Sequence, residues 1–329
     1  MSDARAVREW RPGRPVDLAG TLGTLVRGSG DPSHRRAGAE GLWRATRTPD
    51  GAALLHVRVV APLGLVLAEA WGPGRAWVLD GVPDLLGARD DGGEGGDGPG
   101  FADFRPRPEH RLLVEAWRAR PGVRTPRSRA VVEALVWAAL EQVVTGKEAR
   151  RAVRLLVRRY GEPAPGAPAL EGGPAAGMLV PPTPAQWLRV PTWEWLRAGV
   201  EGRRSAVVMR AARVAGRLEA TLGGAAAEAD RALRTLPGVG RWTSAEVRQR
   251  AHGDADAFSF DDYHVAKNVT WALTGHVLDD DACAEVIDCY AGHRYRVQRL
   301  LELAGVARPR RGPRFTLPTH TPAGSGGRS

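Results

Sequence analysis

The sequence feature that most restricts the fold is a short glycine-containing connection between two helical segments. Residues 230–235 have the composition of a helix end and residues 241–247 that of a helix start, and residues 236–240 between them are Leu-Pro-Gly-Val-Gly. A connection this short predicts a tight helical hairpin. Its two glycines let backbone amides point outward at the positive N-terminal end of the second helix, a geometry that binds a phosphate oxygen without distinguishing bases. The plain alternative is a helix connection that only turns the chain.

The hairpin supplies the candidate residues for contact with a DNA backbone. They are Leu236, Gly238, Val239, Gly240, Arg241 and Thr243, and Arg234 adds a further charge at the rim. The chain carries 47 Lys plus Arg against 37 Asp plus Glu, a formal net charge of +10, which favours a polyanionic partner. Only Lys147 and Lys267 are lysines, and a GC-rich genome also produces such an arginine bias. Charge therefore supports nucleic-acid binding without establishing it.

Hydrophobic periodicity changes once along the chain. Between residues 15 and 86, short runs such as 54–60 and 75–79 alternate apolar and polar side chains, and turn-forming Gly and Pro separate them, which predicts antiparallel strands. Beyond residue 108, apolar side chains recur at three and four positions, which predicts helices. The expected fold is α+β: a small mixed α/β domain over 1–105 with a flexible connector at 90–100, an all-helical domain over 106–305, and a disordered tail over 306–329.

Several classes of protein are disfavoured by what the sequence lacks. Its two cysteines, Cys283 and Cys289, have no His or Cys partner in a recurring spacing, which predicts neither a disulfide framework nor a metal site. The longest apolar stretch, 52–71, alternates and contains Arg58, so no membrane span is expected. The N-terminus lacks the apolar segment of a signal peptide, and we therefore expect a cytoplasmic protein.

An aspartate pair follows the hairpin at the start of another apolar helix. The segment 260–264, Phe-Asp-Asp-Tyr-His, precedes a helical pattern that runs through Leu273 and is closed by Gly275. Taken alone, Asp262 is expected to be an N-cap, whose carboxylate accepts hydrogen bonds from the first free amides of the helix. Its combination with the hairpin indicates a functional role as well.

The hairpin, the helix start at Trp242-Thr243 and the string Asp262-Tyr263-His264 together resemble the helix-hairpin-helix DNA glycosylase superfamily, and within it the 3-methyladenine DNA glycosylase II branch. The resemblance covers residues 205–300, extends back to about residue 110, and reaches residues 1–100 only through an N-terminal α/β unit that this branch also has. It implies that Asp262, not Asp261, is the catalytic aspartate, because the family places that residue two positions before His. Such a carboxylate stabilises the oxocarbenium-like sugar that forms as the base leaves, and orients or deprotonates the attacking water.

The resemblance also assigns a base pocket and a DNA wedge. Trp242 occupies the place where strand-cutting relatives carry a Schiff-base lysine, which implies a monofunctional enzyme whose indole stacks on a flipped base; its plain alternative is core packing. Glu246, one turn later, stands where some alkylation enzymes have an aromatic residue, and its plain alternative is an ion pair. Gln142 and Val143 match the turn that wedges into the DNA stack, with simple packing as the alternative. Residues 293–296 match an element that closes the pocket.

We therefore expect a DNA N-glycosylase, without strand-cleaving lyase activity, that flips out and excises alkylated purines of the 3-methyladenine type from double-stranded DNA. The resemblance implies a nucleoid-associated monomer that requires no cofactor, with a monovalent cation on the hairpin's backbone carbonyls as the one ion it allows. The main alternative is a non-catalytic protein that senses lesions or DNA structure on the same fold. A strand-cutting glycosylase is a remote alternative, because the required lysine is missing.

Overall fold

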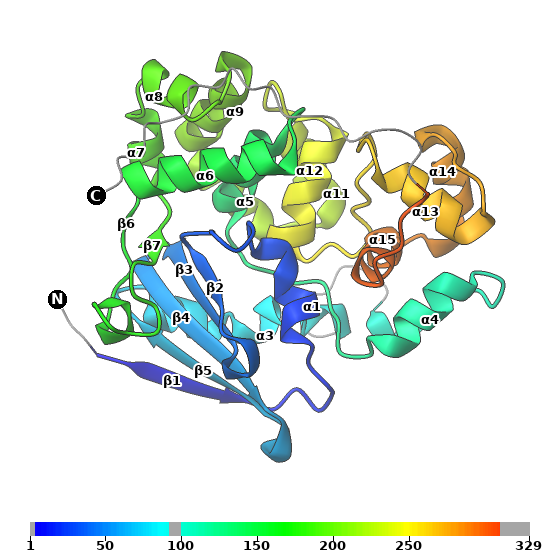
Figure 1. Cartoon of the computed structure of the whole chain (residues 1–329), viewed down its shortest axis with the longest axis horizontal. Coiled ribbons are helices and arrows are strands. Elements are labelled where there is room, and N and C mark those ends of the chain that lie inside the picture. The colour runs from blue at the N-terminus through cyan, green and yellow to red at the C-terminus, as the bar shows by residue number, and fades with distance from the viewer. Residues whose placement is uncertain (1–3, 92–99, 310–329) are drawn as a thin grey trace.

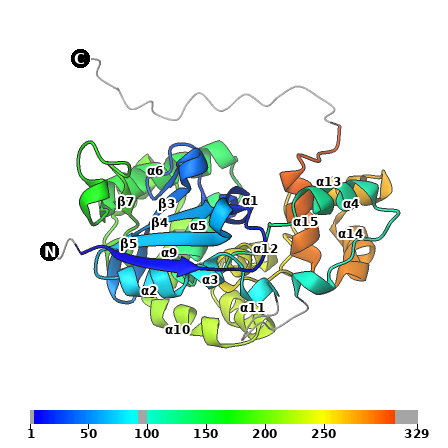
Figure 2. The same ribbon diagram turned by 90° about the horizontal axis from the view of Figure 1, so that it is seen from below.

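The computed structural model describes residues 4–91 and 100–309 of the chain. Its fold is α+β, as predicted at this level, with a five-stranded antiparallel sheet and a larger set of helices (Figure 1). In Figure 2 the sheet lies on one side of the molecule, and a second lobe of helices lies on the other, formed by α4 (Arg111–Ala119), α13 (Val265–Thr274), α14 (Asp280–Ile287) and α15 (Arg294–Leu303). None of the helices in the two described ranges is long and apolar enough to cross a membrane.

The sheet has the strand order β1-β5-β4-β3-β2, and every neighbouring pair is antiparallel. Along β4, alternation sends Leu55 and Val57 into one core and Leu54 into a second core on the opposite face, where Trp43 lies. Both faces of the sheet are therefore covered, which explains why β4 is apolar along most of its length. The strand bounds are β1 (Ala6–Trp10), β2 (His34–Arg36), β3 (Leu42–Thr48), β4 (Gly51–Val60) and β5 (Leu65–Trp71).

The prediction of a strand over residues 75–79 is wrong. This run forms helix α2 (Arg75–Asp80), which is followed at once by α3 (Val82–Leu85). Val78, Leu79 and Val82 are buried in the core beneath the sheet, and their spacing of one and four fits one face of a helix. A window of five residues is too short to distinguish the two periodicities, so only the packing against the sheet decides between them.

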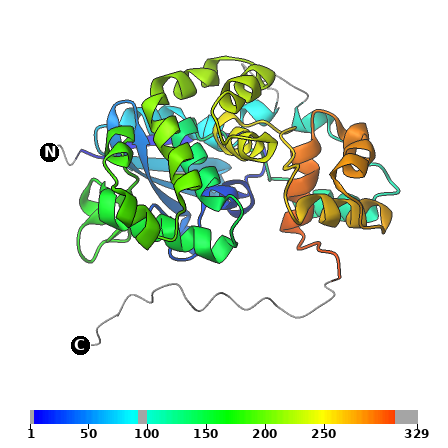
Figure 3. The same cartoon turned by 90° about the horizontal axis from the view of Figure 1, so that it is seen from above.

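The helices on the same side of the molecule as the sheet, which we call the first lobe, gather around α5 (Val131–Glu141). The apolar residues of α5 are all buried. Figure 3 shows the yellow segment that holds α12 between the green helices of this lobe and the orange helices of the second lobe. The other helices of the first lobe are α6 (Gly146–Tyr160), α7 (Pro184–Leu188), α8 (Thr192–Arg197), α9 (Gly202–Arg213), α10 (Ala215–Ala220), α11 (Ala226–Arg234) and α12 (Arg241–Val247).

The expected all-helical domain is interrupted by a two-stranded ribbon, so this part of the prediction is wrong. The ribbon pairs β6 (Glu162–Pro163) with β7 (Leu179–Val180). The backbone amide of Leu179 donates to the carbonyl of Pro32 (2.8 Å), and Met178 packs in the same core as Trp43 of the sheet. The ribbon therefore covers the outer face of the N-terminal sheet. Gly and Pro in this stretch exclude a helix but permit short extended pairs.

Asp90 joins the N-terminal part of the chain to the second lobe. It lies in a 3-10 turn, Arg89–Asp91, at the start of the predicted flexible connector 90–100; residues 92–99 of that connector, and 310–329 of the predicted disordered tail, lie outside the described residues. The guanidinium of Arg296 on α15 donates to both carboxylate oxygens of Asp90, at 2.6 and 2.9 Å. Burial alone would raise the pKa of Asp90, but the charge of Arg296 holds it below its ordinary value.

Replacing Asp90 by Asn keeps the shape of the side chain but leaves the buried Arg296 guanidinium without its counterion. We expect D90N to lower the free energy of unfolding by about 3–5 kcal/mol. Asp80→Asn is the matched control, because Asp80 pairs with Arg8 at a site where its side chain is 76% exposed, and its loss should cost less than about 1 kcal/mol. Urea unfolding followed by circular dichroism at pH 7 measures both, and equal losses would contradict the role assigned to Asp90.

Candidate functional site

The predicted hairpin forms between α11 and α12. Gly238 adopts a φ of 92°, and the amide of Val239 donates to the carbonyl of Leu236 (3.0 Å), which closes the turn. The side chains of Leu236 and Val239 are buried and anchor the hairpin in the core of the first lobe, so only their backbone faces outward. Gly240 is the N-cap of α12, and no other atom lies within 4 Å of the place where a Cβ would stand. The space in front of the first amides of α12 is therefore open.

The two predicted wedge residues lie directly beside this turn. The Gln142 amide donates to the carbonyl of Gly238 (2.9 Å) and to the Thr243 hydroxyl (2.8 Å), which ties the end of α5 to the hairpin. Val143 is fully exposed and has a φ of 52°. A β-branched residue rarely adopts a positive φ, and such strain concentrates at functional sites. The structure thus presents one apolar side chain to solvent next to the hairpin, while its role as a wedge stays a prediction.

Asp262 binds the first amides of α13 as its plain interpretation predicted, but it lies two residues before the N-cap, which is His264. Its Oδ1 accepts hydrogen bonds from the backbone amides of His264 (2.8 Å) and Val265 (3.1 Å). Within the described part of the chain no donor contacts Oδ2 of the same carboxylate. Capping and catalysis are compatible here, because the two amides fix one oxygen and leave the other available.

Arg241 brings the hairpin and the aspartate segment together. From the first position of α12 its guanidinium lies 4.3 Å from the centre of the Phe260 ring, two residues before Asp262. On the other side of this segment, Asp280 at the start of α14 has a raised pKa, mainly because it is partly buried and also because Asp261 and Asp262 carry like charges. The positive Arg241 opposes that shift. The hairpin and Asp262 therefore share one electrostatic neighbourhood.

Trp242 and Glu246 lie one turn apart on α12, as the predicted base pocket requires. The Nε1 atom of Trp242 is buried and has no hydrogen-bond partner among the described residues. Glu246 is only 7% exposed; its Oε1 accepts from the Ser259 hydroxyl (2.7 Å), and its Oε2 pairs with Arg250 (2.8 Å). Burial raises the pKa of Glu246, and Arg250 opposes the rise. Glu246 therefore forms an ion pair, as its plain alternative had it, at the position that the resemblance assigns to the base pocket.

Two arginines of this polar cluster were not found from the sequence. Arg27 comes from the N-terminal part of the chain, is buried, and lies 3.5 Å from the Glu141 carboxylate at the end of α5. Arg250 donates to the carbonyl of Thr24 (3.0 Å). No local pattern marks Arg27, because its partner lies 114 positions away. Arg250 follows Glu246 by four positions, a helical spacing that could have indicated the pair. The arrangement places charged groups, rather than a ring of aromatic residues, around Glu246.

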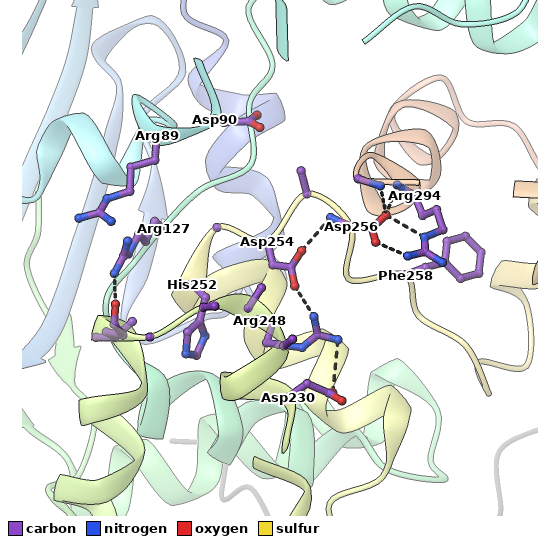
Figure 4. Close-up of a pocket in the computed structure, with 18 of the residues that line it drawn as sticks. Arg89, Asp90, Arg127, Asp230, Arg248, His252, Asp254, Asp256, Phe258 and Arg294 are labelled. Carbon is purple, nitrogen blue, oxygen red and sulfur yellow. Dashed lines mark hydrogen bonds and ion pairs between the residues drawn. The ribbon is translucent and has the colours of Figure 1, made fainter. Parts of the chain in front are cut away.

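A cavity of about 590 Å³ lies between the lobes, and Arg241 and Phe260 are among the residues that line it (Figure 4). Aspartates hold two of its arginines: Arg248 bridges Asp230 and Asp254, and Arg294 pairs with Asp256. The predicted closing element 293–296 therefore forms part of this junction, through Arg294. Neither Trp242 nor Asp262 lines the cavity. The cavity lies at the junction of the two lobes, and it is not the predicted base pocket.

The structure bears on the predicted ion only through the hairpin carbonyls. Pro237 O accepts a hydrogen bond from Arg210 (3.0 Å) and Gly238 O accepts one from Gln142, so both already have side-chain donors. A monovalent cation on the remaining carbonyls stays a prediction. Within residues 4–91 and 100–309, His, Cys, Asp and Glu side chains form no group of three that has the arrangement of a metal site.

A side chain should have different effects at the two hairpin glycines. Gly238→Ala should lower the melting temperature by several degrees, because its φ is positive and a Cβ would stand 2.6 Å from Val207 Cγ2. Gly240→Ala should lower the melting temperature by less, because the space is open and only the weaker N-cap preference of Ala acts there. Its Cβ should also weaken binding of duplex DNA at least about tenfold, a loss of about 1.4 kcal/mol in fluorescence anisotropy titrations. Unchanged affinity in G240A would exclude phosphate binding at this turn.

No protein-family model and no curated protein matches this sequence. Solved structures do match. The structure of a 3-methyladenine DNA-glycosylase from Archaeoglobus fulgidus aligns with 91% of this chain and 98% of its own, with a TM-score of 0.68 and 17% identity. That of an 8-oxoguanine glycosylase/lyase from Clostridium acetobutylicum, in complex with double-stranded DNA, aligns with 88% of this chain and 91% of its own, with a TM-score of 0.58 and 12% identity. The chain therefore has the fold of the helix-hairpin-helix DNA glycosylases, as the sequence motifs predicted.

Proposed function

We propose that the protein is a DNA glycosylase that hydrolyses the N-glycosidic bond of a damaged nucleotide in double-stranded DNA. The observation that carries the proposal is the position of Asp262 beside the hairpin, with one carboxylate oxygen fixed by two amides and the other without a donor. The fold shared with glycosylases from two organisms supports the same activity. A non-catalytic DNA-binding protein on this fold would need the hairpin but not the free carboxylate oxygen.

In the proposed reaction a backbone phosphate binds the first amides of α12, in the open space beside Gly240. The exposed Val143 fills the space that the extruded nucleotide leaves in the duplex. The bond from the sugar C1′ to the base nitrogen breaks, and its electron pair leaves with the base. The Asp262 carboxylate stabilises the positive charge that develops on the sugar. A water molecule then bonds to C1′ and gives its proton to Asp262. The proposal thus assigns residues of this chain to the phosphate, to the space in the duplex, to the sugar and to the attacking water.

We further propose that the enzyme does not cut the DNA strand. Trp242 stands at the hairpin position that would have to carry a Schiff-base lysine. Lys267 lies on α13, with its Nζ 4.3 Å from the centre of the Tyr263 ring, and Lys147 lies on α6. Neither lysine is on α12. Borohydride should therefore trap no covalent adduct between the protein and damaged DNA.

For the damaged base we propose an alkylated purine of the 3-methyladenine type. The electron-rich indole of Trp242 attracts a cationic methylated base, and such a base leaves without needing a strong general acid. One observation favours a second candidate, an oxidised purine. The Trp242 Nε1 donor lacks a partner and the cluster around Glu246 is ionic, which suits a neutral base that carries hydrogen-bond acceptors. We propose that the protein acts as a monomer, in the compartment that holds the DNA.

Asp262→Asn tests the chemistry. Asn accepts hydrogen bonds from the first amides of a helix as well as Asp does, so the variant should keep its melting temperature and its affinity for DNA. It loses the negative charge, and we expect base release to slow at least about 100-fold. The matched control is Asp279→Asn, because Asp279 caps α14 through a hydrogen bond of the same kind, with its Oδ1 3.0 Å from the amide nitrogen of Ala282, outside the site. This control should release base at the wild-type rate.

The assay offers the full-length protein duplexes that contain either methylated or oxidised purines, and identifies the free base by mass spectrometry. Release from the methylated duplex supports the alkylated purine, and release from the oxidised duplex alone assigns the second candidate. Turnover retained in D262N would contradict the role of Asp262. Binding without release of any base would assign the non-catalytic function.

A further inference from the structure

A second cavity, of about 490 Å³, lies immediately beside the hairpin. Its apolar floor includes Val214, Leu218 and Leu236, and α9, α10 and α11 form its walls. Arg210, Arg213 and Arg217 line it. We call this cavity the arginine groove. Figure 2 shows α10 and α11 along the same edge of the molecule.

The three arginines of the groove carry charge that the protein itself does not neutralise. All three are exposed, and none pairs with a carboxylate among the described residues. The nearest acidic residues along these helices are engaged elsewhere: Glu219 accepts from the amides of Val131 and Val132, and Glu228 accepts from the amide of Ala225. Three like charges around an apolar floor repel one another, and an external polyanion relieves that repulsion.

The contrast with neighbouring arginines strengthens this point. Arg234 and Arg248 lie on the other side of the hairpin helices, and both pair with Asp230. Arg234 and Arg248 are therefore part of the fold, whereas the arginines of the groove face outward with no carboxylate partner among the described residues.

The groove is continuous with the hairpin. The guanidinium of Arg210 donates to the carbonyl of Pro237 (3.0 Å), so the first arginine of the groove touches the turn itself. Arg213 lies three positions after Arg210 on α9, and Arg217 follows on α10, beyond the break at Val214. All three line the same cavity.

We propose that the arginine groove extends the DNA-binding surface and holds the phosphodiester backbone of the strand that the hairpin grips. This inference rests on the proposed function, since it presupposes DNA at the hairpin. The phosphates contact Arg213 and Arg217, while Arg210 also supports the turn. Contacts of this kind increase affinity on any sequence and do not select the damaged base.

The test is the salt dependence of DNA binding. In the full-length protein, Arg213→Gln with Arg217→Gln removes two charges from the groove and leaves Arg210 on the hairpin. Each lost phosphate contact should reduce the slope of log K against log salt concentration by about 0.9, so the slope should fall by about 1.8 in anisotropy titrations with an undamaged duplex. Single-turnover base release at saturating protein should stay at the wild-type rate, because neither residue touches the base.

Arg111→Gln with Arg118→Gln is the matched control. These two arginines are exposed, lie seven positions apart on α4 in the second lobe, and have no carboxylate partner among the described residues. The control should keep the wild-type slope. A slope for the groove variant equal to that of the wild type or of the control would overturn the proposal.

The outcomes also separate this inference from the proposed function. Base release by the wild type together with an unaltered slope in the groove variant would overturn the groove alone. Failure of the wild type to bind DNA would overturn both. Sedimentation that shows self-association dependent on Arg213 and Arg217, with an unaltered slope, would assign the groove to a second copy of this chain and overturn the proposal.

Discussion

The candidate site depends on one buried hydroxyl group. Ser259 Oγ donates to Glu246 on α12 (2.7 Å) and accepts from the side-chain amides of Gln249 (2.8 Å) and Gln298 (3.0 Å), the latter on α15 in the second lobe. The backbone amide of Ser259 also donates to the carbonyl oxygen of the Gln298 side chain (3.0 Å). A fully satisfied buried network of this kind fixes a single geometry. Because Asp262 follows three residues later, this contact sets where the carboxylate stands relative to the hairpin.

Arginine serves two purposes in this chain, and the presence of a counterion separates them. Arg296 is buried against Asp90, 206 positions away in the sequence. The half-buried Arg250 pairs with Glu246 on the preceding turn and donates to the distant carbonyl of Thr24. Such pairs contribute geometry more than stability, since burial of both charges offsets much of their attraction. The exposed arginines of the arginine groove have no carboxylate partner in the described part of the chain. The basic composition alone could not distinguish these two uses, because it counts both equally.

The sequence predicted what local patterns determine. The α+β class, the hairpin at 236–240 and the hydrogen bonds of Asp262 to the first amides of α13 follow from periodicity, turn chemistry and capping preferences, and the structure contains them. The strand predicted over 75–79 is a helix because only contact with the sheet decides so short a run. Arg27 and Ser259 escaped notice because their partners lie about 114 and 13 positions away and no periodicity links them. The polar cluster around Glu246 is a product of tertiary packing, and motifs cannot predict it.

The central claim is that the fixed carboxylate of Asp262 stabilises positive charge on a sugar held beside the hairpin. The most direct measurement compares the affinity of the protein for two duplexes that carry an abasic-site analogue, one with a cationic pyrrolidine ring and one with a neutral tetrahydrofuran ring. A site built for a cationic transition state binds the cationic analogue more tightly. We predict a preference of at least about tenfold for the cationic analogue in the wild-type protein, worth about 1.4 kcal/mol, and equal affinities in D262N. Equal affinities in the wild type, or a preference that D262N retains, would contradict the account.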